Sequence, residues 1–354
     1  MSGSPDGGQP GEGNVRRTRR GTGRTTLTDV ARVAGVAPIT ASRALNSPDR
    51  VSAETLARVR QAVDNTGYVP NLLAGGLASS RSRLGALVVP SIASPIYLDF
   101  VQALTTSLNE ADYQLLLGES GYHNARESDL LDAIIARRPD GIVLTGTMHS
   151  AQGRKRLRSS GIPVVETWGM TSRPLDMLAG VAQQEVGAAA AAHLNTIGRR
   201  RTAVIAADDH MASRRARGFT TEVARTRGAE PEAATVPIVR ITAPSTLGQG
   251  RRALSRLLEQ HEVDSVFCTS DTIALGVLIE AQARGLSVPD DLAVIGYGDM
   301  NFAADTPPPL TTVRVDGAEI GRQAARFLLD KSQGRRVSRR VVDIGFSLVV
   351  RESA

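Results

Sequence analysis

The chain has 354 residues, which is too many for one ordinary domain and enough for two or three. Hydrophobic residues make up 41% and charged residues 22%, a balance typical of a soluble globular protein, and no apolar run is long enough to span a membrane. The formal net charge is +6, and only Lys155 and Lys331 among the 42 basic residues are lysines. This basic balance permits a polyanionic partner without requiring one, since codon composition also explains a bias toward arginine.

The cysteine content and the N-terminal segment indicate in which cellular compartment the protein is expected. The single cysteine, Cys268, rules out an internal disulfide, and the first residues lack the apolar stretch of a secretion signal. We therefore expect a cytoplasmic protein with no membrane partner. Residues 1–24 are glycine-rich, and we expect a disordered basic arm there, either with a binding role or as a solvated extension. Its arginines are Arg16, Arg17, Arg19, Arg20 and Arg24.

Three short helical patterns follow the arm. Apolar residues recur at helical spacing over residues 27–34, and Asp29 lies in the first turn, where an acid suits the helix dipole. Gly35 permits a sharp turn, and Pro38 suits the first turn of the next helix. A third helix is expected over residues 52–67. This tight middle turn predicts a helix-turn-helix, which places its second helix in the major groove of DNA; an unrelated small helical bundle is the alternative.

Residues 25–80 as a whole resemble the LacI/GalR family of bacterial repressors. The segments that carry the resemblance are "TLTDVARVAGV", "TASRALN", "VSAETLARVRQAV", "GYVPN" and "LAGGLAS". The resemblance implies an all-α helix-turn-helix head at 25–70, a hinge helix and linker at 71–83, and an effector-binding and dimerisation domain at 84–354. It also implies that hinge helices of a dimer fold on operator DNA, where Leu77 of each subunit enters the minor groove. Gly75 and Gly76 weaken a free helix by roughly 1 kcal/mol each, which a segment that folds on binding tolerates.

The family pattern also assigns the DNA contacts. Arg43 is expected to contact a base, and Pro38 and Ile39 occupy the positions that distinguish operators. Because neither Pro38 nor Ile39 donates a side-chain hydrogen bond, apolar contact with a thymine methyl is the readout left to them. Many relatives have Ser or Thr at Ala37, so this chain should lack a helix cap worth about 1 kcal/mol. The expected DNA-binding residues, including phosphate contacts at Thr26 and Asn46, are Thr26, Leu27, Pro38, Ile39, Thr40, Ser42, Arg43, Asn46, Asn71, Ala74 and Leu77.

Residues 84–354 alternate strand-like apolar runs with helical patterns. Runs such as "LGALVVP", "GIVLTG", "TAVIAA" and "LAVIGYG" alternate with helical patterns such as that over residues 247–260. This alternation predicts parallel sheets covered by helices, with enough units for two sheets. The resemblance implies a two-lobed α/β domain like the periplasmic binding proteins, with three crossings between lobes and the ligand between them. We expect lobe 1 at 84–182 and about 312–338, and lobe 2 at 183–311 and about 339–354.

Motifs for catalysis are missing from the sequence. The histidines are scattered without metal-ligand spacing, and no nucleotide-binding or nucleophile motif occurs. Asp208-Asp209-His210 ends a predicted strand and is interpreted as a loop, and Cys268 is interpreted as core. We predict that the protein is not an enzyme and uses no metal or cofactor. A sugar-binding receptor, which would need a signal peptide, and a sugar-metabolising enzyme, which would need a nucleotide or metal motif, are the alternatives.

An effector pocket between the lobes follows from the resemblance. "SRRARGF" matches a family pattern in which Arg215 holds effector hydroxyls or a carboxylate, and "CTSDTIALG" matches one that offers Asp271, although Ser270 replaces the usual Asn. Trp168, the only tryptophan, ends a strand and is either core or pocket. The expected effector-binding residues are Ser94, Tyr97, Glu119, Trp168, Arg215 and Asp271.

The class of effector follows from a narrower resemblance. "DYQLLLGESGYH", "DGIVLTGTMH" and "GIPVVETW" look most like the gluconate-operon repressor branch, which implies a sugar acid or its phosphate, whereas "ETWGM" and "GVAQQEVG" depart from it. Arg215 suits such a ligand, because a guanidinium pairs with a carboxylate through two hydrogen bonds. We predict a transcriptional regulator that represses a carbohydrate or sugar-acid operon, binds double-stranded operator DNA as a homodimer, and resides on the nucleoid. The operator, the direction of the switch and a higher oligomer stay open.

Overall fold

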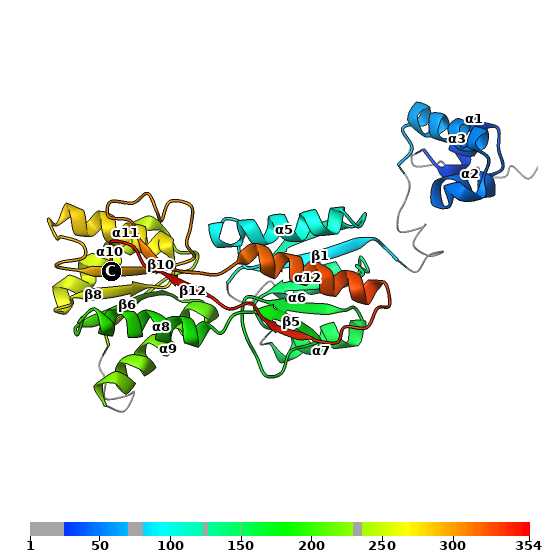
Figure 1. Cartoon of the computed structure of the whole chain (residues 1–354). Helices are drawn as coiled ribbons and strands as arrows, with labels where there is room; N and C mark the ends of the chain where they lie inside the picture. Colours follow the sequence, from blue (N-terminus) through cyan, green and yellow to red (C-terminus); the bar gives the residue numbers. More distant parts are fainter. Residues whose placement is uncertain (1–24, 70–80, 123–126, 149, 229–235) are drawn as a thin grey trace, which may run out of the picture. The chain divides into compact units, whose positions relative to one another are not determined.

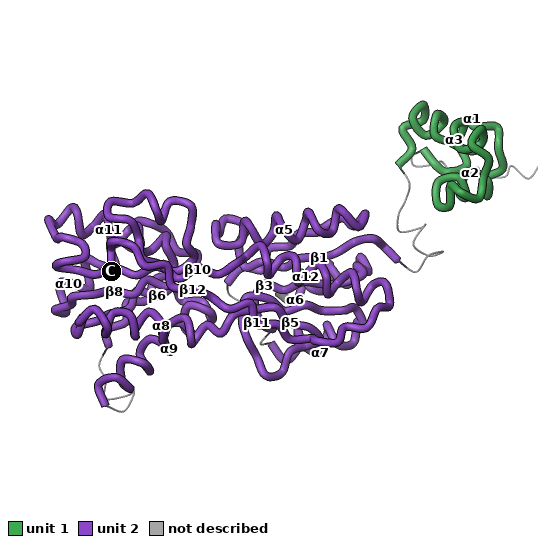
Figure 2. The backbone as a smooth tube through the Cα atoms, in the orientation of Figure 1, with its two compact units in different colours: residues 1–80 green, residues 81–354 purple. Residues whose placement is uncertain are grey.

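The computed structural model describes residues 25–69, 81–122, 127–148, 150–228 and 236–354. The chain divides into two compact units, residues 1–80 and residues 81–354 (Figure 2). The expected basic arm, and the expected hinge helix with Asn71, Ala74 and Leu77, lie outside the described residues. No helix of the described part is long and apolar enough to cross a bilayer.

The first unit is a bundle of short helices (Figure 1). Its elements are α1 (Leu27–Ala34), α2 (Pro38–Asn46), the 3-10 turn η1 (Pro48–Arg50) and α3 (Ala53–Thr66). The hydroxyl of Thr26 accepts the backbone N–H of Asp29, whose carboxylate accepts the N–H of Thr26, so a reciprocal cap begins α1. Gly35 ends α1 with a φ of 61°, a conformation that glycine adopts without strain. The core is made of small side chains, which let three short helices approach closely: Val30, Ala31, Ala34, Ala41, Ala44, Val59 and Ala62.

The second unit begins with a six-stranded sheet whose described pairs are all parallel. The strand order is β11-β5-β4-β3-β1-β2. The strands are β1 (Leu84–Val89), β2 (Gln114–Glu119), β3 (Gly141–Thr145), β4 (Val164–Thr167), β5 (Met177–Gly180) and β11 (Val341–Asp343). Side chains alternate between two cores: Leu87 and Val89 of β1 pack toward α5 (Leu98–Asn109) and α12 (Gly317–Ser332), and Ala86 and Val88 toward α6 (Glu127–Ile135) and α7 (Ala151–Ser160). Helices on both faces explain why β1 is buried almost throughout.

A second six-stranded sheet has the order β12-β10-β9-β8-β6-β7. Its strands are β6 (Thr202–Ala207), β7 (Ile238–Ile241), β8 (Ser265–Cys268), β9 (Ala293–Tyr297), β10 (Thr311–Arg314) and β12 (Ser347–Val349), of which β12 runs antiparallel to β10. Helices α8 (Gln183–Thr196) and α9 (His210–Arg227) share one core with this sheet, and α10 (Leu247–Gln260) and α11 (Asp271–Ala283) share another. We call the part built on the first sheet lobe 1 and the part built on the second sheet lobe 2. Figure 1 shows the two lobes joined by α8, β10 and β12 with their flanking segments.

Two expected lobe boundaries were wrong by a few residues. Strand β10 (311–314) pairs with β9, so it belongs to lobe 2 and the chain crosses after Arg314 rather than near residue 312. Strand β11 (341–343) pairs with β5, so it belongs to lobe 1 and the chain crosses back after Asp343 rather than near residue 339. The first crossing ends where α8 begins, at Gln183, as the expected start of lobe 2 at residue 183 requires. Strands β10 and β11 are four and three residues long, and the sequence of so short a strand does not indicate which sheet it joins.

Candidate functional site

Helix α2 presents the residues expected to read DNA. Ala41 and Ala44 face the core of the first unit, whereas Pro38, Ile39 and Arg43 are exposed, Ile39 at 68%. Thr40 and Ser42 are half-buried, and Asn46 is exposed with its amide donating to the carbonyl of Ser42. The N-cap residue Ala37 makes no side-chain cap, as its sequence indicates. The exposed face of α2 therefore combines one guanidinium with an apolar side chain, a composition suited to reading bases.

The two predicted contacts at the start of α1 also have structural tasks. The hydroxyl of Thr26 donates to Asp29 over 2.7 Å as part of the cap, and Leu27 packs partly against the core. The hydrogen bond from Thr26 and the neighbouring Arg32 lower the pKa of the Asp29 carboxyl to about 2. Thr26 is exposed, so it remains available for a phosphate.

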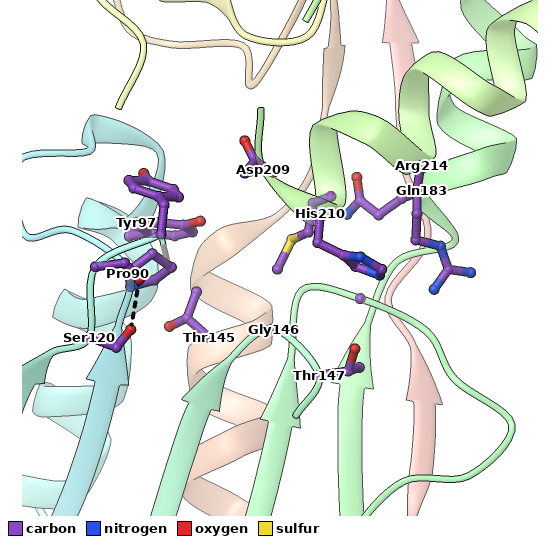
Figure 3. A pocket seen from close by; sticks show the side chains of 14 residues that line it. Pro90, Tyr97, Ser120, Thr145, Gly146, Thr147, Gln183, Asp209, His210 and Arg214 are labelled. Carbon is purple, nitrogen blue, oxygen red and sulfur yellow. Dashed lines mark hydrogen bonds between the residues drawn. The ribbon is translucent and has the colours of Figure 1, made fainter. Parts of the chain in front are cut away.

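Two adjoining cavities lie between the lobes, beyond the carboxyl ends of the strands. The outer chamber, of ≈130 Å³, is shown in Figure 3 and is lined by Pro90, Tyr97, Ser120, Gly121, Tyr122, Thr145, Gly146, Thr147, Gly169, Gln183, Asp209, His210, Met211 and Arg214. The inner chamber, of ≈70 Å³, is lined by residues that include Ser94, Tyr97, Tyr122, Trp168, Asp209, Arg215, Ser245, Thr269, Ser270, Tyr297 and Met300. Both lobes contribute to each chamber, and the chambers share Tyr97, Tyr122, Asp209 and Met211. The arrangement is that of a ligand cleft in an α/β protein.

Aromatic rings dominate the inner chamber. Tyr97, Tyr122, Trp168 and Tyr297 line it, and the ring of Trp168 meets that of Tyr97 edge-on with centroids 5.3 Å apart. Burial raises the pKa of the Tyr97 hydroxyl well above its usual value, and burial also raises that of Tyr122, against the effect of a hydrogen bond with Ser94. Both phenols are therefore neutral at physiological pH. They can donate and accept hydrogen bonds toward an uncharged or hydroxylated ligand.

Arg215 is held from two sides and is 6% exposed. One terminal nitrogen donates to the side-chain oxygen of Gln183 over 2.6 Å, and the other donates to the carbonyl of Thr269 over 2.9 Å. The guanidinium carbon lies 3.9 Å from the centroid of the Tyr297 ring, within cation–π range. Among the described residues, the Nε of Arg215 has no hydrogen-bond partner, and neither does the Nε1 of Trp168 nor the hydroxyl of Tyr297. All three atoms are buried, and they belong to residues that line the inner chamber.

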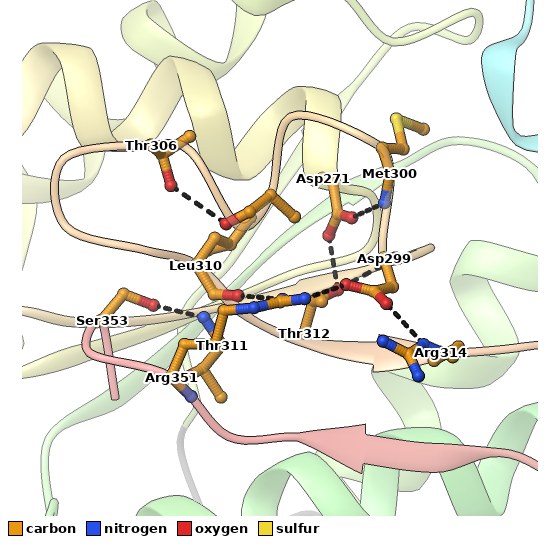
Figure 4. A network of polar contacts seen from close by, with 11 residues as sticks. Asp271, Asp299, Met300, Thr306, Leu310, Thr311, Thr312, Arg314, Arg351 and Ser353 are labelled. Carbon is orange, nitrogen blue, oxygen red and sulfur yellow. Dashed lines mark hydrogen bonds and ion pairs between the residues drawn. The ribbon is translucent and has the colours of Figure 1, made fainter.

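Asp271 was predicted to contact the effector, but it does not line either chamber. Its side chain is fully buried. One carboxylate oxygen accepts the hydroxyl of Thr312 over 2.6 Å, and the other accepts the N–H of Met300 over 2.8 Å (Figure 4). Burial raises the pKa of this carboxyl to about 6. Asp271 therefore holds the loop after β9, and a sequence motif at a helix start could not show that its side chain turns inward.

Glu119 also departs from its expected place. It is the last residue of β2, is exposed, and lines neither chamber. Neighbouring Ser120 and Tyr122, which the sequence analysis did not select, line the outer chamber instead. The strand ends before its carboxyl-side loop turns into the cleft, so the residues one to three positions later reach the ligand space.

The tempting Asp208-Asp209-His210 run, interpreted as a loop, contributes to the cleft. Asp208 accepts the N–H of Ala243 over 2.6 Å, and Asp209 caps α9 through the N–H of Ala212. His210 lines the outer chamber, and burial together with nearby Arg214 lowers the pKa of its imidazole. Within the described ranges no cluster of three or more His, Cys, Asp or Glu residues could hold a metal ion. Cys268 is buried in the core of lobe 2.

Comparisons with known proteins agree with both units. Residues 26–71 match the family model for bacterial regulatory proteins of the lacI family, and residues 191–354 match that for a periplasmic binding protein-like domain. The HTH-type transcriptional regulator GntR of Pseudomonas aeruginosa is 37% identical over 342 residues, which cover 96% of this chain and 98% of that protein. The chain belongs to the LacI family of transcriptional regulators. It is thus a DNA-binding regulator and not a member of an enzyme family.

Other members of the LacI family share its architecture. GntR of Escherichia coli K12 is 30% identical, with 92% of this chain and 97% of that protein covered. A LacI-family regulator from Silicibacter pomeroyi superposes with a TM-score of 0.85 at 28% identity over 93% of this chain and 99% of that one. GntR from Chromobacterium violaceum gives a TM-score of 0.72 at 32% identity over 76% and 98%. The predicted fold, a helix-turn-helix head with a two-lobed α/β domain, is confirmed.

Proposed function

We propose that this regulator represses an operon for carbohydrate or sugar-acid catabolism and that a sugar acid or its phosphate, bound between the lobes, is its effector. The observation that carries the proposal is that three residues lining the inner chamber each keep a buried donor with no hydrogen-bond partner among the described residues: Arg215 Nε, Trp168 Nε1 and Tyr297 Oη. A carboxylate is the small ligand group that accepts several hydrogen bonds at once. Aromatic walls suit the apolar faces of a polyhydroxylated chain.

The outer chamber suits the distal end of the same ligand. Asp209, at the boundary of the two chambers, is an acceptor for hydroxyl groups, and Arg214 and His210 lie beyond it on α9. A phosphate at that end would accept charge-assisted hydrogen bonds from the guanidinium of Arg214, so the site suits a sugar-acid phosphate as well as a sugar acid. A neighbour of known structure at 29% identity is described as a CelR–cellobiose complex, which supports a carbohydrate-derived ligand for this fold.

On DNA, we propose that the protein acts as a homodimer on a palindromic operator in the cytoplasm, in association with the nucleoid. Arg43 with Ile39 and Pro38 would read bases, and Thr26 and Asn46 would contact phosphates. The proposed division is an arm at 1–24, a head at 25–70, a hinge at 71–83 and the effector domain from residue 84. Leu77 in the hinge would enter the minor groove.

Effector binding would act through the angle between the lobes. A ligand that contacts Arg215 from lobe 2 and Tyr97 from lobe 1 favours one lobe angle, and only such a differential affinity shifts the equilibrium. Strand β1 begins at Leu84, directly after the proposed hinge, so a changed angle would alter the spacing of the two hinges in a dimer. The coupling expected is about 1–3 kcal/mol.

The test combines ligand binding with operator binding. Gluconate, 6-phosphogluconate, glucose and glucose 6-phosphate are titrated while the fluorescence of Trp168 is followed, and the ligand that binds is then added to a gel shift with DNA upstream of the gene. We expect the acids to bind more tightly than the neutral sugar and to change operator affinity. Arg215→Ala should keep operator binding and lose the response, whereas Arg217→Ala, an exposed arginine on the same helix, should behave as wild type. Equal responses of the two variants would remove Arg215 as the anchor.

A further inference from the structure

Gln183 connects the effector-binding arginine to the opposite lobe. It is the first residue of α8, where the chain has just crossed into lobe 2, and it is 1% exposed. Its side-chain oxygen accepts from Arg215 over 2.6 Å, and its side-chain nitrogen donates to the backbone carbonyl of Trp168 over 2.6 Å. Because a guanidinium only donates and a carbonyl only accepts, the two partners define the orientation of the amide. One side chain therefore joins Arg215 of lobe 2 to Trp168 of lobe 1.

The backbone at the lobe 1 end of this connection is unusual. Trp168 has a φ of 65°, in the left-handed region that bulky residues rarely adopt, and such residues concentrate at ligand sites and switches. Its carbonyl meets Gln183, its N–H donates to the carbonyl of Ala179, and its ring packs against Tyr97 and Phe100. The bond from Gln183 thus helps to hold a strained residue whose indole N–H faces no protein acceptor in the described part of the chain.

Helix packing explains why Gln183 and Arg215 meet. Helices α8 and α9 cross at two glycines, where an added Cβ would lie 1.9 Å from a backbone oxygen: Gly187 against Arg215, and Gly218 against Gln184. This close approach places the start of α8 beside Arg215. The position of Arg215 relative to Trp168 is consequently determined by α8, one of the segments that connect the lobes.

We propose that Gln183 is a positioning residue that couples effector occupancy to the lobe angle. This inference rests on the proposed function, in which the ligand engages the Nε of Arg215 and the Nε1 of Trp168 together. A change in lobe angle moves Trp168 relative to Arg215. While the Gln183 bridge is intact, the Nε of Arg215 and the Nε1 of Trp168 stay close enough to bind one ligand group; when the bridge breaks, they separate. Without the bridge, ligand binding at Arg215 no longer reports on lobe 1.

Two substitutions separate the two bonds. Gln183→Glu keeps the size and an acceptor for Arg215 but removes the donor to Trp168, and Gln183→Met removes both bonds at similar length. Gln184→Glu is the matched control, because the neighbouring Gln184 side chain is exposed on the same helix turn. Should Gln183→Met fail to fold, the near-isosteric Gln183→Glu decides the question.

The first readout needs no effector. The full-length protein has one tryptophan, so fluorescence excited where only tryptophan absorbs, and the tryptophan band of the near-ultraviolet circular dichroism spectrum, report on Trp168. We expect a red-shifted emission and a weaker aromatic signal in Gln183→Glu and Gln183→Met, and no change in Gln184→Glu. Wild-type spectra for both Gln183 variants would show that the bridge does not hold Trp168 and would overturn the proposal.

The second readout is the ratio of operator affinities with and without saturating gluconate or 6-phosphogluconate. For Gln183→Glu we expect operator affinity without ligand to match wild type while the ratio shrinks by about fivefold or more, since couplings of this kind span about 5–150-fold. A purely structural role would instead weaken operator binding itself and leave the ratio unchanged, which contradicts the proposal. If neither acid binds the wild type, the proposed effector class fails, and the effector-free spectra still decide whether Gln183 holds Trp168.

Discussion

In the helix-turn-helix unit the side chains expected to read DNA, Arg43 and Ile39, project from α2 into solvent, whereas in the second unit Arg215 and Trp168 are 6% and 2% exposed. The exposed residues of α2 differ from those that pack in the core, Ala41, Ala44 and Leu45, so recognition and stability are separate there. In the second unit the side chains proposed to bind ligand also connect the lobes, because Arg215 is bonded to Gln183, whose amide in turn donates to the carbonyl of Trp168. A surface site can therefore change freely, while a buried site changes together with the fold around it.

The most damaging substitution should be one at the close crossing of α8 and α9. In Gly218→Ala the new Cβ would lie 1.9 Å from the carbonyl oxygen of Gln184, and backbone cannot yield as a flexible side chain does. We expect a loss of about 3 kcal/mol or more in the free energy of unfolding, measured by urea denaturation, together with loss of the ligand response. Gly248→Ala in α10 is the control, since its Cβ would meet only the end of Arg252 at 3.4 Å. That change should be neutral or stabilise by about 0.4–1 kcal/mol; similar losses in both variants would contradict the crossing argument.

Arg43→Ala should separate recognition from stability in the first unit. Removal of a bidentate base contact costs about 1–3 kcal/mol of discrimination per half-site, while an exposed arginine contributes little to the fold. Gel shifts with operator and random DNA should show a loss confined to operator, with unchanged thermal unfolding. Arg60→Ala, an exposed arginine on α3, serves as the control. An equal loss on both DNAs would make Arg43 a phosphate contact.

Asp271→Asn tests a carboxyl that is buried beside the cleft without lining it. Its pKa is raised from 3.8 to about 6 by burial, so the folded state binds the proton more tightly than the unfolded state. Stability from this group is present below pH 4 and is lost as the pH rises through about 6, on the order of 3 kcal/mol. The new amide in this variant keeps a hydrogen-bond partner for Met300 and for Thr312. The free energy of unfolding of the variant should therefore not fall with rising pH, and its advantage over wild type should grow between pH 4 and pH 7.

Urea denaturation across that pH range measures the difference, with Asp305→Asn, an exposed carboxyl of the same lobe, as control. Ligand affinity of Asp271→Asn should change little, because Asp271 lines neither chamber. A large loss of ligand affinity with unchanged pH dependence would restore Asp271 as an effector contact.

The smallest effect is expected at the start of α2, where the N-cap residue Ala37 offers no side-chain acceptor. Ala37→Ser should supply one and stabilise the first unit by about 1 kcal/mol. Ser52→Ala, which removes the existing cap at Thr55 of α3, should cost a similar amount. Native-state hydrogen exchange of amides in α1 to α3 measures both changes. Equal protection in the two variants would show that caps do not limit the stability of this unit.

Sequence patterns located most of the fold and part of the cleft. Eight strands, from β1 to β4 and from β6 to β9, lie where long apolar runs predict them. Strands β5, β10, β11 and β12 were not identified from the sequence, and each acquires its place in a sheet only from the strand it pairs with. In the cleft, Ser94, Tyr97, Trp168 and Arg215 reach the inner chamber, whereas Asp271 and Glu119 do not.

The residues missed in the cleft share one property. Tyr122, Tyr297 and His210 lie at or just after strand ends, where a search of every such position could have found them. Gln183 also lies just after a strand end, but that strand, β5, was not identified from the sequence, so the same search would not have reached it. Its importance comes from Arg215, 32 residues away, and from Trp168, 15 residues away.

The sequence by itself determined the helix-turn-helix, its caps and its exposed reading face, because these depend on contacts within a few residues and on the period of the helix. It also determined the alternation of strands and helices, since burial on both faces of a parallel sheet requires apolar runs. Only the tertiary structure decided which sheet β10 and β11 join, that Asp271 turns toward Thr312, and that Gln183 joins Arg215 to Trp168. These outcomes depend on which backbones approach each other, as α8 and α9 do at Gly187 and Gly218, and the partner in such a contact is far away in the chain.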